Sequence, residues 1–234
     1  MERTVKKDIP VKVAILDNSV NPLVYKPVEH WAPHLDVPWE AFVAREGKLP
    51  SLGAGFSHVI VTGSEATILE RESWADREAE FVKDAHERGL ALLGSCWGHQ
   101  LLAFALDGPQ AVGRCRRPEI GWIEIERRSD SGLLGPRGGA FSFSLHFDEV
   151  VNAPGRFEVL ASTPTCPVQA MALPGGRAWG LQIHPEIDVE AARALLAGLI
   201  GADPSLDPLY RKALEAAPRD SGLVGGIVRY FLAS

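Results

Sequence analysis

The stretch LALLGSCWGHQLLAFALDG, residues 90–108, joins a strand pattern directly to a helix pattern. Residues 90–94 form a short apolar run typical of a buried strand, and the residues after Cys96 carry apolar side chains at helical spacing. Cys96 stands at the junction, between Gly94 and Gly98. Glycines allow the sharp, strained turn of a nucleophile elbow and let a substrate approach without meeting a Cβ. The junction therefore predicts a strand–elbow–helix unit with a cysteine at its tip.

The sequence before this unit alternates short apolar runs with helical patterns. VKVAILD (11–17) and HVIVTG (58–63) are predicted as buried strands, and the second ends at a glycine. A helix should follow, with Ser73 as its N-cap and Gly89 at its end. Such alternation is the signature of a parallel sheet with crossover helices. We therefore expect an α/β fold with an open, mostly parallel sheet flanked by helices.

The sequence after Gly113 is richer in strand patterns. Asp188 then opens an amphipathic helix, and the linker 201–208 leads to further helical sequence. The predicted strands, separated by Gly/Pro turns, are 121–127, 139–150, 157–162, 167–173 and 178–184. We expect this strand-rich part to be partly antiparallel. The predicted organisation is one domain over residues 1–200, with a C-terminal helical extension over 201–234 packed on it.

The composition argues against several kinds of partner and compartment. The 234-residue chain has a formal net charge of −6, whereas nucleic acids and anionic membranes require a basic surface. No apolar run approaches the ~20 residues that span a bilayer, and the charged N-terminus lacks the apolar stretch of a secretory signal. The three cysteines, Cys96, Cys115 and Cys166, form no C-x-x-C pair. This usage predicts a reducing, cytoplasmic compartment, with one reactive thiol and two structural cysteines.

Cys96 is the candidate nucleophile. At a helix N-terminus the helix dipole favours a thiolate. The backbone N–H of Trp97 would point to a developing oxyanion. Gln100, four residues after Cys96 on the same helix face, would contact a bound substrate. The alternative is a buried, inert core cysteine, which is the ordinary role of cysteine away from such a junction.

Two further segments offer partners for this thiol. In HPE (184–186), an extended chain would place His184 and Glu186 on the same side, so that the carboxylate orients the imidazole as a base. In TGS (62–64), at the end of a predicted strand, the N–H of Gly63 would complete an oxyanion hole. Each tripeptide alone is more typical of a surface turn or a strand end. Their positions, each at the C-terminal end of a predicted strand, place them at one edge of the sheet.

Together these segments resemble the class I, or triad, glutamine amidotransferases over roughly residues 11–200. The G-x-C-x-G-x-Q elbow, the H-x-E pair and the oxyanion glycine of that family are matched by Gly94, Cys96, Gly98, Gln100, His184, Glu186 and Gly63. SLHFDEV (144–150) resembles the family's S-H-x-D-x-V segment, whose backbone holds the glutamine, with Leu145 where a small polar residue is commoner. The resemblance implies a flavodoxin-like fold and substrate contacts by His146 and Phe147.

The resemblance also implies glutaminase chemistry without a metal or an organic cofactor. Cys96 attacks the side-chain amide of glutamine, His184 protonates the leaving ammonia, and water hydrolyses the γ-glutamyl thioester. The chain has no P-loop and no G-x-G-x-x-G after a strand, so an ammonia-consuming synthetase would be a separate subunit. PEIGW (118–122) resembles the stand-alone members and the GMP-synthase-type glutaminase domains.

Three alternatives remain open at this stage. A stand-alone γ-glutamyl peptidase or hydrolase would use the same residues on a different γ-glutamyl amide. A catalytically silent regulatory subunit would keep the fold without the reaction, although all triad residues are present. A cysteine-elbow relative of the chaperone- or protease-like class would not need the His184–Glu186 pair.

Overall fold

The computed structural model describes residues 10–151 and 155–234. The N-terminal segment for which we expect no secretory signal lies almost wholly outside this part. Within the described residues, nine strands form one sheet in the order β2-β1-β3-β4-β9-β8-β7-β5-β6. The strands are β1 (Val13–Asp17), β2 (Trp39–Val43), β3 (His58–Val61), β4 (Ala91–Ser95), β5 (Val112–Arg127), β6 (Gly138–Val150), β7 (Glu158–Ser162), β8 (Ala170–Ala172) and β9 (Ala178–Leu181).

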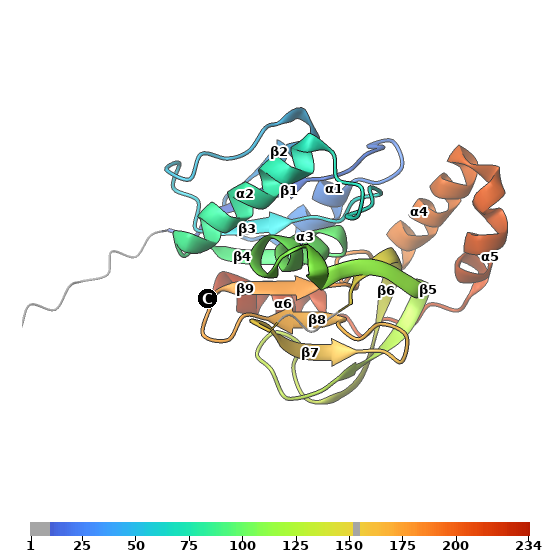
Figure 1. Cartoon of the computed structure of the whole chain (residues 1–234). Coiled ribbons are helices and arrows are strands. Elements are labelled where there is room, and N and C mark those ends of the chain that lie inside the picture. Colours follow the sequence, from blue (N-terminus) through green and yellow to red (C-terminus); the bar gives the residue numbers. More distant parts are fainter. Residues whose placement is uncertain (1–9, 152–154) are drawn as a thin grey trace, which may run out of the picture.

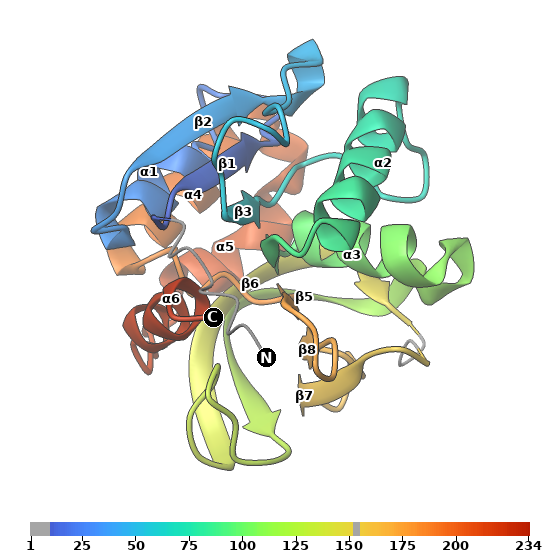
Figure 2. The same cartoon turned by 90° about the vertical axis from the view of Figure 1, so that its left-hand side faces the viewer.

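The sheet has two halves that differ in strand direction. β2, β1, β3, β4 and β9 run parallel to one another and are called here the parallel half. From β9 outward, β8, β7, β5 and β6 are joined by antiparallel pairs and are called the antiparallel half. β5 and β6 form a long ribbon that curves away from the parallel half (Figure 2). The expected α/β fold with an antiparallel part is confirmed, although the sheet is more evenly mixed than predicted.

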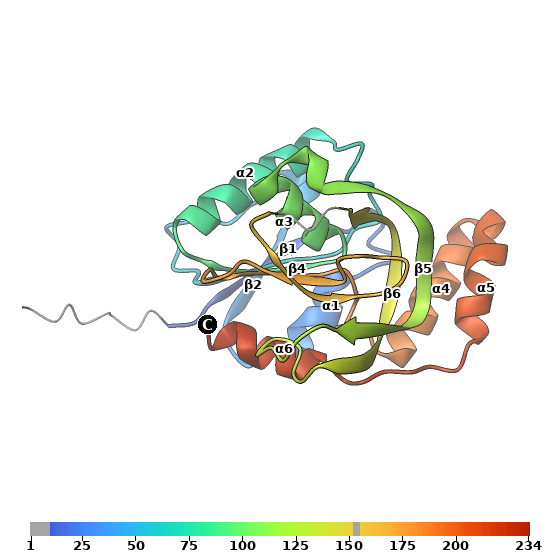
Figure 3. The same ribbon diagram turned by 60° about the horizontal axis from the view of Figure 1, so that its bottom comes forward.

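Helices cover both faces of the parallel half. Figure 3 shows α2 and α3 on one face of the sheet and α1 and α6 on the other. In Figure 1, α4 and α5 lie beside the curved β5–β6 ribbon. The helices are α1 (Pro27–Trp31), α2 (Ser73–Glu87), α3 (Trp97–Asp107), α4 (Val189–Ala202), α5 (Asp207–Glu215) and α6 (Val224–Leu232). Short 3₁₀ turns occupy Ala32–His34, Ala44–Glu46, Pro109–Ala111 and Pro204–Leu206.

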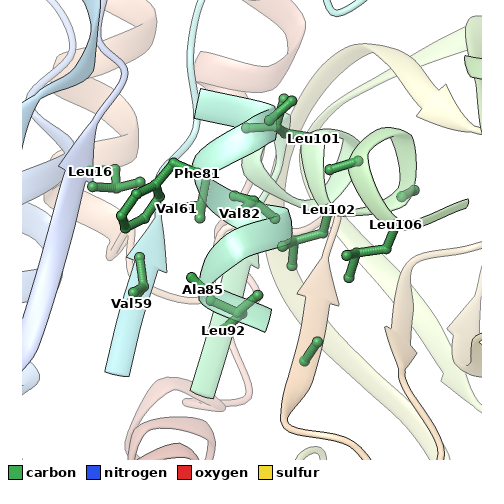
Figure 4. Packing of buried hydrophobic residues seen from close by; sticks show 14 of the residues in the cluster. Leu16, Val59, Val61, Phe81, Val82, Ala85, Leu92, Leu101, Leu102 and Leu106 are labelled. Atoms are coloured by element: carbon green, nitrogen blue, oxygen red, sulfur yellow. The ribbon is translucent and has the colours of Figure 1, made fainter. Parts of the chain in front are cut away.

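The core follows from the alternation of side chains along the buried strands. In β1, Ala14 and Leu16 face the α2–α3 layer, whereas Val13 and Ile15 face the α1–α6 layer. α2 buries an apolar stripe that includes Phe81 against strand residues such as Val59 and Leu92 (Figure 4). Because both faces are covered, the central parallel strands are buried throughout and carry mostly apolar side chains.

Two local predictions are wrong, and one strand was not predicted. Ser73 is the first residue of α2 rather than its cap; the N-cap is Glu72, which makes no side-chain capping bond. The strand predicted over 178–184 ends at Leu181, because the chain bends after β9. β2 lies in a stretch that shows no strand pattern, since it is an edge strand with Trp39 exposed. Gly89 follows α2 with a φ of +77°, as a helix-ending glycine should.

The C-terminal region is built into the core. α4 runs through residue 200, the expected boundary of the extension, and its N-cap Asp188 accepts a hydrogen bond from the Ala191 amide. α6 buries Ile227, Val228 and Phe231 in the cluster on the α1–α6 face. Among the described residues, no helix is long and apolar enough to cross a membrane.

Candidate active site

The elbow between β4 and α3 has the geometry expected of a strained turn. Cys96 has φ +49° and ψ −107°, the one positive φ at a non-glycine position among the described residues. A Cβ on Gly98 would lie 2.0 Å from the carbonyl oxygen of Val61, and one on Gly94 would lie 2.5 Å from the carbonyl oxygen of Gly98. The two glycines are therefore required because α3 passes against β3 and β4 at backbone distance. The strain presents the thiol at the start of α3.

His184 and Glu186 meet in a turn after β9. The Nδ1 of His184 donates to the Oε1 of Glu186 at 2.8 Å, and both side chains are buried. The amide of His184 donates to the carbonyl of Phe143 at 2.8 Å, which fixes the turn to β6. The two residues are thus brought together by a bend, not by the extended strand expected from the sequence. The arrangement leaves the other ring nitrogen of His184 for a different partner.

Ser95 also holds the His184–Glu186 pair in place, a role that was not predicted from the sequence. Its Oγ donates to the Oε1 of Glu186 at 3.0 Å, and Ser95 is fully buried on β4. The carboxylate is therefore held from the strand that also carries the elbow. The G-S-C sequence offered a signal, because the residue before the elbow ends a buried strand.

The charges around His184 favour its protonated form. Burial lowers the pKa of His184, but the neighbouring Cys96 thiolate and the Glu186 carboxylate outweigh burial and raise the pKa to about 10. An imidazolium at neutral pH pairs with a thiolate, which is the reactive form of cysteine. The raised pKa thus favours a protonated His184 beside the Cys96 thiol.

Cys96 and His184 open into a cavity of about 180 Å³. Besides His184, five parts of the chain line the cavity: the stretch before α1, the loop after β3, the elbow, the antiparallel half, and helices α4 and α5. The lining residues are Tyr25, Ser64, Glu65, Ala66, Thr67, Cys96, Trp97, Gln100, Arg114, Leu145, His146, Phe147, Asp148, Leu195, Leu199 and Tyr210. The cavity therefore lies where loops from the parallel half meet β6 and the C-terminal helices. Such a junction at the carboxyl ends of parallel strands is the usual place for a ligand.

Gly63 lies directly beside His184. A Cβ at this position would be 2.6 Å from the hydroxyl of Tyr25 and 3.0 Å from the Cε1 of His184. Trp97 is the first residue of α3, where helix amides have no partner within the helix. Both expected oxyanion donors thus belong to segments that border the thiol. Tyr25, which lies in a stretch without a recognisable pattern, was not predicted.

The three expected substrate contacts have different surroundings. The side-chain amide of Gln100 is buried and donates to the Asp148 carbonyl at 2.7 Å and to Gln182 Oε1 at 3.2 Å. The ring of His146 points to Glu119, at 3.0 Å from its carboxylate. Phe147 lines the cavity, and its carbonyl accepts a hydrogen bond from the Cys115 thiol at 2.8 Å. The structure thus places all three at the cavity wall, with Gln100 and His146 engaged in protein contacts.

Asp148 is a third residue that the sequence did not single out, after Ser95 and Tyr25. Its carboxylate accepts hydrogen bonds from the Thr67 hydroxyl and, at 3.2 Å, from the Ile68 amide, and it pairs with Arg114 at 3.0 Å. One buried side chain of β6 therefore holds the loop that follows Gly63. Asp148 stands at the D of the S-H-x-D-x-V-like segment, which is the signal that could have found it.

The fold and the site define an α/β protein with a cysteine elbow and a buried histidine–carboxylate pair. The chain belongs to the glutamine amidotransferase class-I family, whose match covers residues 45–197. It is 38% identical over 171 residues to a GMP synthase (glutamine-hydrolysing) of Aeropyrum pernix, covering 70% of this chain and 32% of that protein. The family resemblance found in the sequence is thereby confirmed.

Two further proteins extend the comparison. A γ-glutamyl-L-1-hydroxyisopropylamide hydrolase of a Pseudomonas species is 33% identical over 157 residues, which are 63% of this chain and 53% of that protein. The chain thus spans about a third to a half of these curated relatives. A glutamine amidotransferase crystal structure from Thermotoga maritima matches with a TM-score of 0.73 at 21% identity, covering 95% of this chain and 96% of the other. This last likeness shows the shared fold.

Proposed function

We propose that this chain hydrolyses the side-chain amide of glutamine through a γ-glutamyl thioester on Cys96. The observation that carries the proposal is the buried His184–Glu186 pair at one wall of the cavity into which the Cys96 thiol opens. A nucleophile, a base and an orienting carboxylate in this relation are the requirement for acyl transfer. The reaction needs no redox change.

The proposed steps use these residues in turn. The Cys96 thiolate attacks the amide carbon, and the amides of Trp97 and Gly63 stabilise the resulting oxyanion. The carbon–nitrogen bond then breaks as His184 gives its proton to the departing ammonia. A water molecule, deprotonated by the now neutral His184, attacks the thioester and releases glutamate and the thiolate. Glu186 keeps its contact with His184 throughout and stabilises the imidazolium.

A γ-glutamyl amide with a substituted nitrogen is the second candidate substrate. The similarity to the Pseudomonas hydrolase, which acts on such an amide, favours it. So does the apolar contribution of Leu195, Leu199 and Tyr210 to the cavity wall, because free ammonia needs no apolar surface. Glutamine and its N-alkyl amides would share the same thioester intermediate. They differ in the leaving amine alone.

A separate synthetase subunit is the proposed partner. This chain covers 32% of the length of the Aeropyrum GMP synthase. Residues of the chain's own α4 and α5 border the cavity, so a partner would approach over these helices. We also propose a cytoplasmic location, because Cys96, Cys115 and Cys166 are all free thiols.

The test is intact mass spectrometry after incubation with 6-diazo-5-oxo-norleucine, an electrophile that mimics glutamine. We expect one adduct per chain, absent in Cys96→Ala and retained in Cys115→Ala. Release of ammonia from glutamine, compared with release of amines from γ-glutamyl alkylamides, then ranks the two candidate substrates. If neither glutamine nor a γ-glutamyl amide acylates Cys96, the silent-subunit alternative replaces the proposal.

A further inference from the structure

A buried polar cluster lies behind the part of β6 that lines the cavity, and the proposed reaction does not use it. Its centre is Glu119 of β5, which is 8% exposed. Four side chains converge on the Glu119 carboxylate: His146, Thr163, Thr165 and Gln169. A carboxylate so surrounded in the interior needs a structural or functional reason, because a buried charge is costly unless it is paired.

The ring of His146 is held between two hydrogen-bond acceptors. Its Nε2 lies 3.0 Å from Glu119 Oε2, and its Nδ1 lies 3.1 Å from the carbonyl oxygen of Asp148. A carbonyl oxygen and an ionised carboxylate can accept hydrogen bonds but cannot donate them. Both ring nitrogens of His146 thus face acceptors, and these two contacts fix the orientation of the ring. It is 2% exposed and cannot exchange this partner for water without opening the strand.

The hydrogen-bond partners of Glu119 favour the ionised form of its carboxyl group. Burial raises the pKa of Glu119, but the hydrogen bonds from His146, Thr163 and Thr165 and the charge of His146 bring it below its usual value. With both carboxylate oxygens accepting two hydrogen bonds each, all its partners are donors. The two residues thus form a buried, hydrogen-bonded pair at salt-bridge distance, 3.0 Å.

The pair stands at an irregular point of the β5–β6 ladder. The register shifts between Arg114 and Glu119, and regular pairing resumes where Glu119 faces His146 across the strands. Cross-strand side-chain pairs set register, and a bulge leaves it locally undetermined. A strong pair next to the shift therefore determines where the following residues of β6 lie.

Those residues form the cavity wall opposite the thiol. The Leu145 carbonyl is 3.6 Å from the Sγ of Cys96. The Asp148 carbonyl accepts from both His146 Nδ1 and Gln100, which connects the pair to the elbow helix. A displacement of this segment would change the width of the cavity at the point of attack.

We propose that Glu119 and His146 are positioning residues whose pairing fixes residues 145–148 of β6 for binding the glutamyl part of the substrate. This inference rests on the proposed function of the Cys96 site. The pair acts through the backbone of β6, so it affects how well substrate is bound and aligned rather than the reactivity of the thiol.

A metal site is the competing explanation for the cluster. Glu119, His146 and Cys166 each offer a ligand atom, and these atoms lie within 4.8 Å of one another. Both ring nitrogens of His146 already have hydrogen-bond partners, however, and each oxygen of the Glu119 carboxylate already has two. Burial raises the pKa of the Cys166 thiol far above its usual range, which opposes the thiolate that a metal requires. The contacts fit a hydrogen-bonded pair.

Glu119→Gln tests the inference, because it keeps the size of the side chain and removes the charge. Glu124→Gln, an exposed carboxylate on the same strand, is the matched control. We expect Glu119→Gln to raise the KM for glutamine about 100-fold, the order of effect of a small misplacement of substrate. The kcat should fall far less, and alkylation of Cys96 by iodoacetamide should match the parent. Labelling by 6-diazo-5-oxo-norleucine should slow with the KM effect, since it requires the glutamyl-binding wall.

The outcomes separate this inference from the proposed function. A parent chain that fails to react with the glutamine mimic overturns the function. A reactive parent with an unchanged KM in Glu119→Gln overturns the inference, as does an equal loss of iodoacetamide reactivity, which would place the effect on the thiol. Stoichiometric zinc in the parent that is lost from the variant would assign the cluster to a metal.

A milder substitution covers the case in which Glu119→Gln does not fold. Thr165→Ala removes one of four donors and keeps the Glu119–His146 pair. We expect it to raise KM about fivefold, the effect of one hydrogen bond. An unchanged KM in Thr165→Ala, with the chain folded, would contradict the inference.

Discussion

The two halves of the sheet bring residues to the same cavity by different means. In the parallel half, Gly63, Cys96 and His184 each follow the C-terminal end of a strand, at β3, β4 and β9. In the antiparallel half, the cavity is lined by residues 145–148 within the long strand β6, which is held from behind by Glu119. The parallel half thus supplies the proposed reactive groups through strand ends that share one edge, and the antiparallel half supplies a wall whose position, in our proposal, depends on the buried Glu119–His146 pair.

Because the two halves contribute to the cavity in different ways, substitutions in them should affect different kinetic constants. Changes in the parallel half should alter the chemical step and therefore kcat. Changes in the antiparallel half should alter the fit of substrate and therefore KM. A substitution in one half that changed the kinetic constant assigned to the other half would contradict this division.

The largest effect should come from Glu186→Gln in the parallel half. The side-chain amide introduced by this substitution carries no charge and cannot stabilise the imidazolium of His184. It can also turn an N–H group toward the Nδ1 of His184, which is itself a donor. We therefore expect kcat to fall about 10⁴-fold. The measurement is the steady-state release of glutamate, with thermal unfolding as the control for folding. A kcat within tenfold of the parent would revive the elbow class that does without the His184–Glu186 pair.

The thiol should lose its pH-independent reactivity in His184→Gln. Since the pKa of His184 is raised to about 10, its imidazolium persists from neutral pH to about pH 9, and the alkylation rate of Cys96 should stay level over that range. In the variant, which lacks the imidazolium, the rate should rise with pH over the same range, and at pH 7 it should be about 30-fold slower, in proportion to the thiolate fraction of an ordinary cysteine. The pH profile of iodoacetamide labelling measures this. A parent rate that climbs steeply between pH 7 and 9 would show that Cys96 and His184 do not form an ion pair.

Asp148→Asn should change KM rather than kcat, because it weakens the hold of β6 on the loop after Gly63. The charged carboxylate accepts from Thr67 and Ile68, and a hydrogen bond to a charged group typically contributes about 1.5–3 kcal/mol, so KM should rise about tenfold. Asp130→Asn, at the exposed β5–β6 turn, is the control, where no change is expected. If kcat fell and KM stayed constant, the division between the halves would fail.

The smallest effect should come from Ser95→Ala. Removing the Ser95 hydroxyl takes one hydrogen bond from Glu186 and should lower kcat about fivefold. Ser142 of β6 is equally buried, but its hydroxyl has no hydrogen-bond partner within the described residues, so Ser142→Ala should leave both constants unchanged. Equal kinetic losses in the two variants would indicate a packing effect and not support of the carboxylate.

Much of the fold and of the candidate site was predictable because the signals were local. The elbow depends on two glycines within five residues, and the strands and helices depend on hydrophobic periodicity. The structure brings Cys96, His184 and Glu186 together as expected from the sequence, and their catalytic roles remain predictions. The bend after Leu181 was not visible in the sequence, since the apolar pattern continues through Ile183.

The contacts that could not be predicted join distant parts of the chain. Ser95 meets Glu186 across 91 positions, and Glu119 meets His146 across 27 positions and a shift of strand register. Such pairs depend on topology and register, which side-chain types alone do not set. Tyr25 was missed for a related reason, because it reaches the cavity from an irregular stretch between β1 and α1.

The close approach of Gly98 to the Val61 carbonyl has a consequence for tracing descent in this family. Any side chain at position 98 would collide with the backbone of β3, whether or not the cysteine is present. A descendant that lost the reaction would thus be free to change Cys96 but still bound to keep both glycines. In such a lineage, the two conserved glycines would indicate that the fold is shared, and the residue at position 96 would indicate whether the reaction is retained.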